Sequence, residues 1–96
     1  MTIAKLEPKR ELEIIEIDGS LESMQDVVGG YIEIVPWVKG LVLVVNEEGK
    51  LLGLDYNFTF GNDIIVGTAF FAREDGEDLT DLTDNDIDLL KQIAFF

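Results

Sequence analysis

The chain has 96 residues, 47% of them hydrophobic, and its 20 acidic and 7 basic residues give a formal net charge of −13. This length and apolar content suit one domain, residues 1–96, with a single core. The chain has no cysteine and no histidine, which excludes disulfides, thiolate metal sites and the usual general base and zinc ligand. There is no apolar leader like that of a signal peptide and no apolar run approaching about 18 residues, so we expect a cytoplasmic protein that is not inserted in a membrane.

The N-terminal third predicts two strands and a helix. Residues 2–7 and 11–17 are rich in strand-forming side chains and flank a Pro-Lys-Arg turn. Ser20 is a good N-cap, and the apolar residues after it recur on one helical face. Gly29–Gly30 follows that face directly, as expected for the end of a helix.

The middle of the chain predicts three more strands. Residues 31–38 form one strand, and Pro36 places it at a sheet edge or near a strand end. Residues 41–45 are continuously apolar and predict a central strand. Residues 46–49 predict a turn, after which 50–54 returns as a short strand and completes a hairpin.

The C-terminal part predicts an irregular segment, a strand, a loop and a helix. Residues 55–62 are irregular, and 63–73 are a strongly apolar strand in which Gly67 marks a bulge or a close backbone approach. Residues about 74–82 predict an acidic loop. Thr83 then caps the last helix, with an aspartate three residues on, a weaker form of the capping box.

These elements together predict an α+β fold. The order is roughly ββαβββ(β)α, with a small, mostly antiparallel sheet of about five strands and two short helices. The connections are too short for parallel crossovers, and no repeat or linker divides the chain.

The acidic stretch at 74–88 is the main functional signal. Eight of its fifteen residues are acidic and none is basic: Glu74, Asp75, Glu77, Asp78, Asp81, Asp84, Asp86 and Asp88. Such a patch disfavours direct binding to nucleic acid or an anionic membrane and attracts a basic protein partner. The alternative is a solvated loop followed by a helix N-terminus, where the helix dipole favours acids without any partner.

Catalytic and metal-binding motifs are missing. The spacing Asp84-x-Asp86-x-Asp88 resembles the start of a calcium loop, but Leu89 and Phe95 replace the required glycine and glutamate. The only serines are Ser20 and Ser23, both explained by the first helix, and phosphate-binding glycine loops are absent. We therefore expect a protein that is not an enzyme and has no cofactor or metal.

A second hypothesis is a small-ligand binding module built from the turn and loop at 46–57. Asn46, Asp55, Tyr56 and Asn57 could line a pocket there, although Asn and Asp are also ordinary turn residues. Trp37, Phe95 and Phe96 are candidates for exposed apolar surface. Because the high charge opposes association and these aromatics favour it, we expect a monomer or a weak homodimer.

Several segments carry a family resemblance. They include Gly-Gly-Tyr-Ile-Glu at 29–33, Asn-Glu-Glu-Gly at 46–49 and the Leu-Thr-Asp segment before the last helix. Over about nine-tenths of its length the chain resembles the domain-of-unknown-function family numbered 3846, small bacterial proteins often met on phages and plasmids. Unlike that family, which commonly continues with proline after Gly53, this chain continues with Leu54. The resemblance implies a compact mobile-element protein and transfers no activity. That setting suggests the hypothesis of a decoy for a basic DNA-binding host protein.

Overall fold

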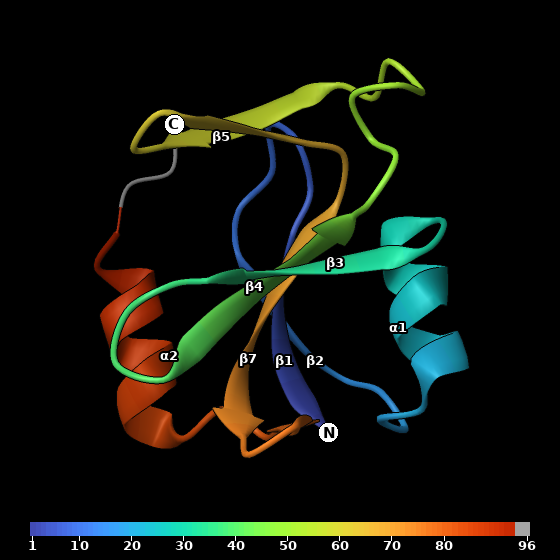
Figure 1. Ribbon diagram of the computed structural model, residues 1–96. Helices are drawn as coiled ribbons and strands as arrows, with labels where there is room; N and C mark the ends of the chain where they lie inside the picture. The colour runs from blue at the N-terminus through green and yellow to red at the C-terminus, as the bar shows by residue number, and fades with distance from the viewer. Residues whose placement is uncertain (94–96) are drawn as a thin grey trace.

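The computed structural model describes residues 1–93, in which the elements follow the order ββαββββββα (Figure 1). Their bounds are β1 Thr2–Leu6, β2 Glu13–Glu16, α1 Leu21–Val28, β3 Ile32–Pro36, β4 Leu41–Asn46, β5 Tyr56–Phe60, β6 Asp63–Val66, β7 Ala69–Asp75, β8 Asp78–Thr80 and α2 Asp84–Lys91. The predicted α+β class with a mostly antiparallel sheet is confirmed, with more strands than the sequence predicts.

Six strands form one antiparallel sheet in the order β2–β1–β7–β4–β3, with β8 paired to the end of β7. The centre is β7, which pairs with β1 through Ala69–Phe71 and with β8 through Arg73–Asp75, while β4 lies along its other side. The sequence predictions for two strands are confirmed, because β4 is buried at every position and β3, with Pro36, ends the sheet.

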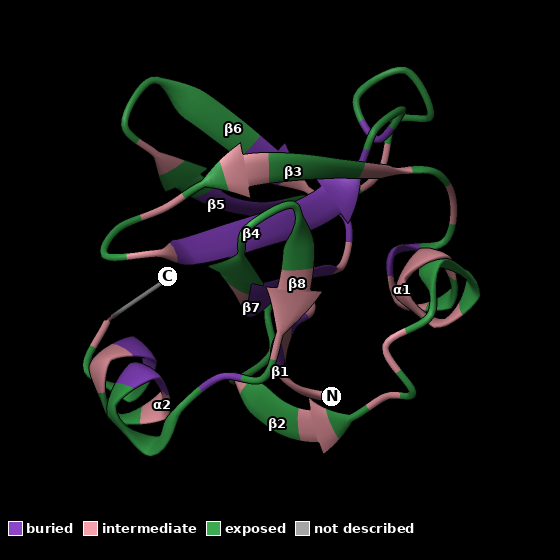
Figure 2. Ribbon diagram, turned by 60° about the horizontal axis from the view of Figure 1, so that its bottom comes forward, coloured by how far each residue is buried: buried purple, intermediate pink, exposed green. Residues whose placement is uncertain are grey.

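Both faces of the sheet are covered, which explains its continuously apolar strands (Figure 2). Phe70 and Phe71 are neighbours on β7 and point to opposite faces, where both are fully buried. Phe71 packs in a core with the β5–β6 hairpin and α2, whereas Phe70 packs in a core beneath α1. The two helices therefore lie on opposite sides of the sheet (Figure 1).

The helix ends follow the predicted capping. The Ser20 hydroxyl accepts a hydrogen bond from the Ser23 amide at 3.0 Å, and α1 ends at Gly29, whose φ of +80° is the left-handed conformation that glycine adopts most easily. At α2, Thr83 and Asp86 form a complete capping box. These local interactions fix where both helices begin.

The predicted strand at 50–54 is wrong. This segment is a compact turn, in which the Leu52 amide donates to the Glu48 carbonyl at 2.9 Å and the Leu54 amide to the Gly49 carbonyl at 3.0 Å. The side chains of Leu51 and Leu52 are exposed there. Two adjacent leucines after a turn are compatible with a strand. Here, however, local hydrogen bonds already pair backbone groups that a strand would use for pairing with a neighbour.

The predictions for 55–73 are also partly wrong. Residues 55–62 contain β5 rather than an irregular loop, and 63–73 contain two strands instead of one. The chain changes sheet at Gly67, whose φ is +74°. A Cβ at Gly67 would lie 2.7 Å from Leu54 Cδ1, so the predicted close backbone approach is confirmed. An apolar run alone cannot show where a chain leaves one sheet for another.

Trp37 is half-buried and packs against the core, so it is not the exposed apolar residue that the sequence suggested. Its ring meets Phe60 edge-on at a centroid distance of 4.0 Å and Phe71 at 5.1 Å. The other two aromatic candidates, Phe95 and Phe96, lie outside the described residues. Within residues 1–93, neither helix is long and apolar enough to cross a membrane.

Candidate functional site

The acidic segment at 74–82 is a β-hairpin, so the predicted loop is wrong. β7 continues to Asp75, and β8 returns from Asp78 after a two-residue turn. Gly76 is the first turn residue and has a φ of +64°, as hairpin turns of this length require. Gly76 within this run is the local signal that could have predicted the turn, because glycine is favoured at the first position of a two-residue hairpin turn.

This hairpin brings like charges together at its tip. Asp75 and Asp78 are directly opposite in the register, with Glu77 between them in the turn. All three side chains are exposed. Because like charges at opposed positions destabilise a strand pair, the tip keeps its acids at some cost in stability.

Asp86 differs from the other acids of the segment because it is only 5% exposed. Its carboxylate accepts from Arg73 Nε at 2.8 Å and from Arg73 Nη2 at 2.5 Å, and also from the Thr83 amide at 2.9 Å. The Arg73 guanidinium holds the pKa of Asp86 down to about 2, with the Thr83 bonds acting in the same direction against burial. Asp86 therefore fastens α2 to β7 and is not available to a partner.

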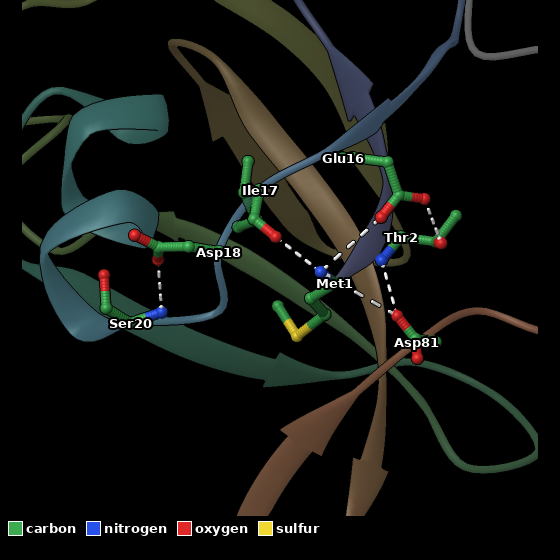
Figure 3. Close-up of polar contacts among 7 residues, drawn as sticks. All are labelled: Met1, Thr2, Glu16, Ile17, Asp18, Ser20 and Asp81. Carbon is green, nitrogen blue, oxygen red and sulfur yellow. Dashed lines mark hydrogen bonds and ion pairs between the residues drawn. The ribbon is translucent and has the colours of Figure 1, made fainter.

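Asp81 anchors the segment to the first strand (Figure 3). Its Oδ1 accepts from the Thr2 amide at 2.6 Å and lies 4.0 Å from the Met1 amino group. That amino group also donates to the Ile17 carbonyl and lies 3.6 Å from Glu16 Oε2. The Asp81 charge is therefore partly compensated, although the side chain remains exposed.

Six of the eight predicted acids remain exposed with no ion pair or hydrogen bond of their side chains among residues 1–93. We call this set the acidic end: Glu74, Asp75, Glu77, Asp78, Asp84 and Asp88. The hairpin tip and the first turn of α2 lie at the same end of the molecule (Figure 1). Arg73, on the same strand as Glu74 and Asp75, is already bound to Asp86. Within the described chain, no group of acids lies close enough to hold a metal ion.

Asn46, a residue of the predicted ligand site, forms hydrogen bonds that hold the fold together. Its side-chain amide donates to the Val28 carbonyl at the end of α1 at 3.2 Å, and its Oδ1 accepts from the Glu48 amide at 2.8 Å. A Cβ at Gly30 would come within 2.9 Å of Asn46 Nδ2. Asn46 thus joins the helix end to the turn after β4, and Gly30 makes room for it.

Asn57 is also structural, being only 2% exposed. Its side-chain amide donates to the carbonyls of Leu6 and Gly67, both at 2.8 Å. The irregularity in the β5–β6 register falls at this residue and turns its side chain toward β1. Asp55 and Tyr56 are the exposed members of the proposed ligand set, and the Tyr56 hydroxyl bonds to Thr59 at 2.8 Å.

A cleft of about 290 Å³ lies between β3 and β6. Its apolar lining includes Val35, Ile65 and Val66, and its charged groups are Glu33, Glu47, Lys50 and Asp63. Lys50 Nζ is 3.1 Å from Asp63 Oδ1, which leaves Glu33 and Glu47 without a cation in the described structure. This cleft could not be predicted from the sequence pattern, because one of its walls belongs to the β5–β6 hairpin, which that pattern does not indicate.

Comparison with known proteins identifies the family. The family model described as "Domain of unknown function (DUF3846)" matches residues 1–94. The chain belongs to this family. No curated protein and no solved structure matches it.

Membership of DUF3846 gives meaning to two of the motifs quoted from the sequence. The Gly-Gly-Tyr-Ile-Glu segment and the Asn-Glu-Glu-Gly segment contact each other through Gly30 and Asn46, and the Glu47 amide donates to the Tyr31 carbonyl at 2.8 Å. In this chain, the family resemblance at these positions therefore rests on residues that build the fold.

Proposed function

We propose that this protein is a non-enzymatic interaction protein that binds a basic partner through its acidic end. The observation that carries the proposal is the set of six exposed acids that form no ion pair within residues 1–93. Charge complementarity of this kind accelerates encounter with a positively charged surface and selects against acidic ones.

The way the acidic end is held supports the same proposal. The Arg73–Asp86 ion pair fixes α2 against β7, and the bond from Thr2 to Asp81 fixes the link between them. The acids are therefore presented on two anchored elements. A pre-ordered surface loses less conformational entropy on binding than a flexible acidic loop would.

A DNA-binding protein is the class of partner we propose. The basic surface of such a protein binds the closely spaced negative charges of DNA phosphates. The acidic end carries several exposed charges of the same sign. The mobile-element setting implied by the family resemblance makes a decoy against a host protein of this class a reasonable role. A decoy and DNA would compete for one surface of the partner.

The test compares two variants that lose the same charge. The first carries Glu74→Gln, Asp75→Asn, Glu77→Gln, Asp78→Asn and Asp88→Asn. The second carries Glu11→Gln, Glu22→Gln, Asp26→Asn, Glu48→Gln and Asp55→Asn, all exposed positions elsewhere. Asp84 is kept in both because its charge stabilises the start of α2.

Immobilised wild-type protein is exposed to a bacterial lysate at low salt, and a captured basic protein is then purified for binding measurements. Five exposed charge pairs at about 0.2–1 kcal/mol each sum to about 1–5 kcal/mol, so binding of the first variant should be weaker by about fivefold to several thousandfold. The second variant should bind almost as wild type, and duplex DNA should displace the partner. Equal weakening in both variants, or a ternary complex with DNA, would contradict the proposal.

A further inference from the structure

A second surface of this protein has the features of a peptide-binding edge. β3 ends the main sheet, and no strand within residues 1–93 pairs with its outer side. The Glu47 amide donates to the Tyr31 carbonyl and the Trp37 amide to the Leu41 carbonyl. Because antiparallel pairing alternates along a strand, the backbone groups of Ile32 and Ile34 point away from β4.

The outer edge of β3 lies beside the cleft between β3 and β6. Glu33 and Val35 on β3 face the cleft, and Ile64 and Val66 on β6 line its opposite wall. Leu51, which also lines the cleft, is 87% exposed, so it adds apolar surface that solvent can reach. The other face of β3 carries Ile34, which is 47% exposed. An added strand would meet apolar surface on both faces.

The charge of the cleft selects the occupant. Glu33 and Glu47 have no ion pair among the described residues, and Lys50 is held by Asp63. A lysine or arginine entering the cleft would gain two carboxylates and lay its methylene groups on Val35 and Ile65. A second copy of this chain is a poor occupant, because each copy has a net charge of −13.

We propose that an extended, basic peptide segment of a partner adds to the edge of β3. Its backbone pairs with Ile32 and Ile34, its basic side chains enter the β3–β6 cleft, and its alternate apolar side chains lie on Ile34. Pro36 has no amide hydrogen, so the pairing is limited to the first part of β3. This surface shares no residue with the acidic end, and the proposal does not depend on it.

The probe is a synthetic peptide of sequence Lys-Val-Lys-Val-Lys-Val-Lys with both ends blocked, which has the required alternation. Hydrogen exchange of the Ile32 and Ile34 amides should slow on adding it, whereas the same peptide with Glu for Lys should have no effect. Unchanged exchange at both amides would overturn the proposal. Protection that appears without peptide and rises with protein concentration would assign the edge to a second copy, and would overturn it too.

Two pairs of variants locate the peptide. Ile34→Pro removes the outward amide without breaking a bond to β4 and should abolish detectable binding, while Ile34→Val keeps both that amide and the apolar surface and should bind. Glu33→Gln with Glu47→Gln should weaken binding about tenfold or more, and the matched Glu11→Gln with Glu22→Gln should not. If instead the acidic-end variant loses the peptide and the Glu33 and Glu47 variant keeps it, the site is at the acidic end and the proposal is wrong. Because the exchange experiment uses wild-type protein, a folding defect in Ile34→Pro leaves the proposal testable.

Discussion

The regions 46–57 and 74–88 are both rich in polar residues, but they differ in how many of these side chains are buried. Asn46 and Asn57 come from turn-like sequence, yet both are buried and bonded to backbone carbonyls. Six of the eight acids come from a segment with strong local structure, yet they remain exposed and unpaired in the described chain. An uncharged polar side chain can be buried when hydrogen bonds satisfy it. A carboxylate is buried only beside a cation, as Asp86 is beside Arg73.

The largest expected effect on stability is that of replacing the buried Asn57. Asn57→Ala removes two hydrogen bonds and leaves the carbonyls of Leu6 and Gly67 without these donors. We expect the free energy of unfolding to fall by about 3 kcal/mol, measured by urea denaturation. The exposed Asn62→Ala, in the β5–β6 turn, is the control and should change stability by less than about 0.5 kcal/mol. A loss at Asn57 as small as this control would show that the side chain is not a structural link.

The next effect concerns Asp86, the one buried acid among residues 1–93. Asp86→Asn should lower the free energy of unfolding by about 2 kcal/mol at neutral pH, because it removes charge-assisted bonds to Arg73. Asp88→Asn, on the same helix but exposed, is the matched control and should have little effect.

The stabilisation that Asp86 provides should depend on pH in a defined direction. The folded pKa of Asp86, about 2, lies below its ordinary value of 3.8, so its contribution is fully present above about pH 4 and disappears as pH falls toward 2. The difference between wild type and Asp86→Asn should therefore shrink over that range. A difference that stays constant from pH 7 to pH 2 would argue against the ion pair as its source.

The smallest effect tests the exposed side. Asp78→Asn should relieve the repulsion from Asp75 across the hairpin tip and raise the midpoint of thermal unfolding by about 1–2 °C at low salt. The gain should vanish in about 1 M salt, where charges are screened within about 3 Å. Glu11→Gln controls for the change in net charge. If it gives the same gain as Asp78→Asn, the local repulsion is not the cause.

The sequence predicted the local parts of the fold well and the long-range parts poorly. Ser20, Gly29 and Thr83 mark helix ends through bonds to near neighbours, so their roles follow from the pattern around them. The break at Gly67 depends on Leu54 and on a second sheet, which no window of sequence contains. An apolar run shows that a segment is buried but not which sheet it joins.

The candidate sites divide in the same way. Charge counting located the acids of the acidic end, because exposure is the default for carboxylates. It could not single out Asp86, whose partner Arg73 is thirteen residues away. The β3–β6 cleft joins residues from three parts of the chain, so only the folded structure brings Glu33, Glu47 and Asp63 together.

The central position of β7 has a consequence for synthesis of the protein. β1 pairs with β2 on one side and with β7 on the other, through contacts such as Ala4 with Phe71, so the second of these pairings can form only after β7 has been made. Until then, the nascent chain can close the local β1–β2 and β3–β4 hairpins but not the sheet that unites them. Such distant pairing is entropically costly and slows folding. The main sheet should therefore form late in translation, in one step that begins when β7 leaves the ribosome.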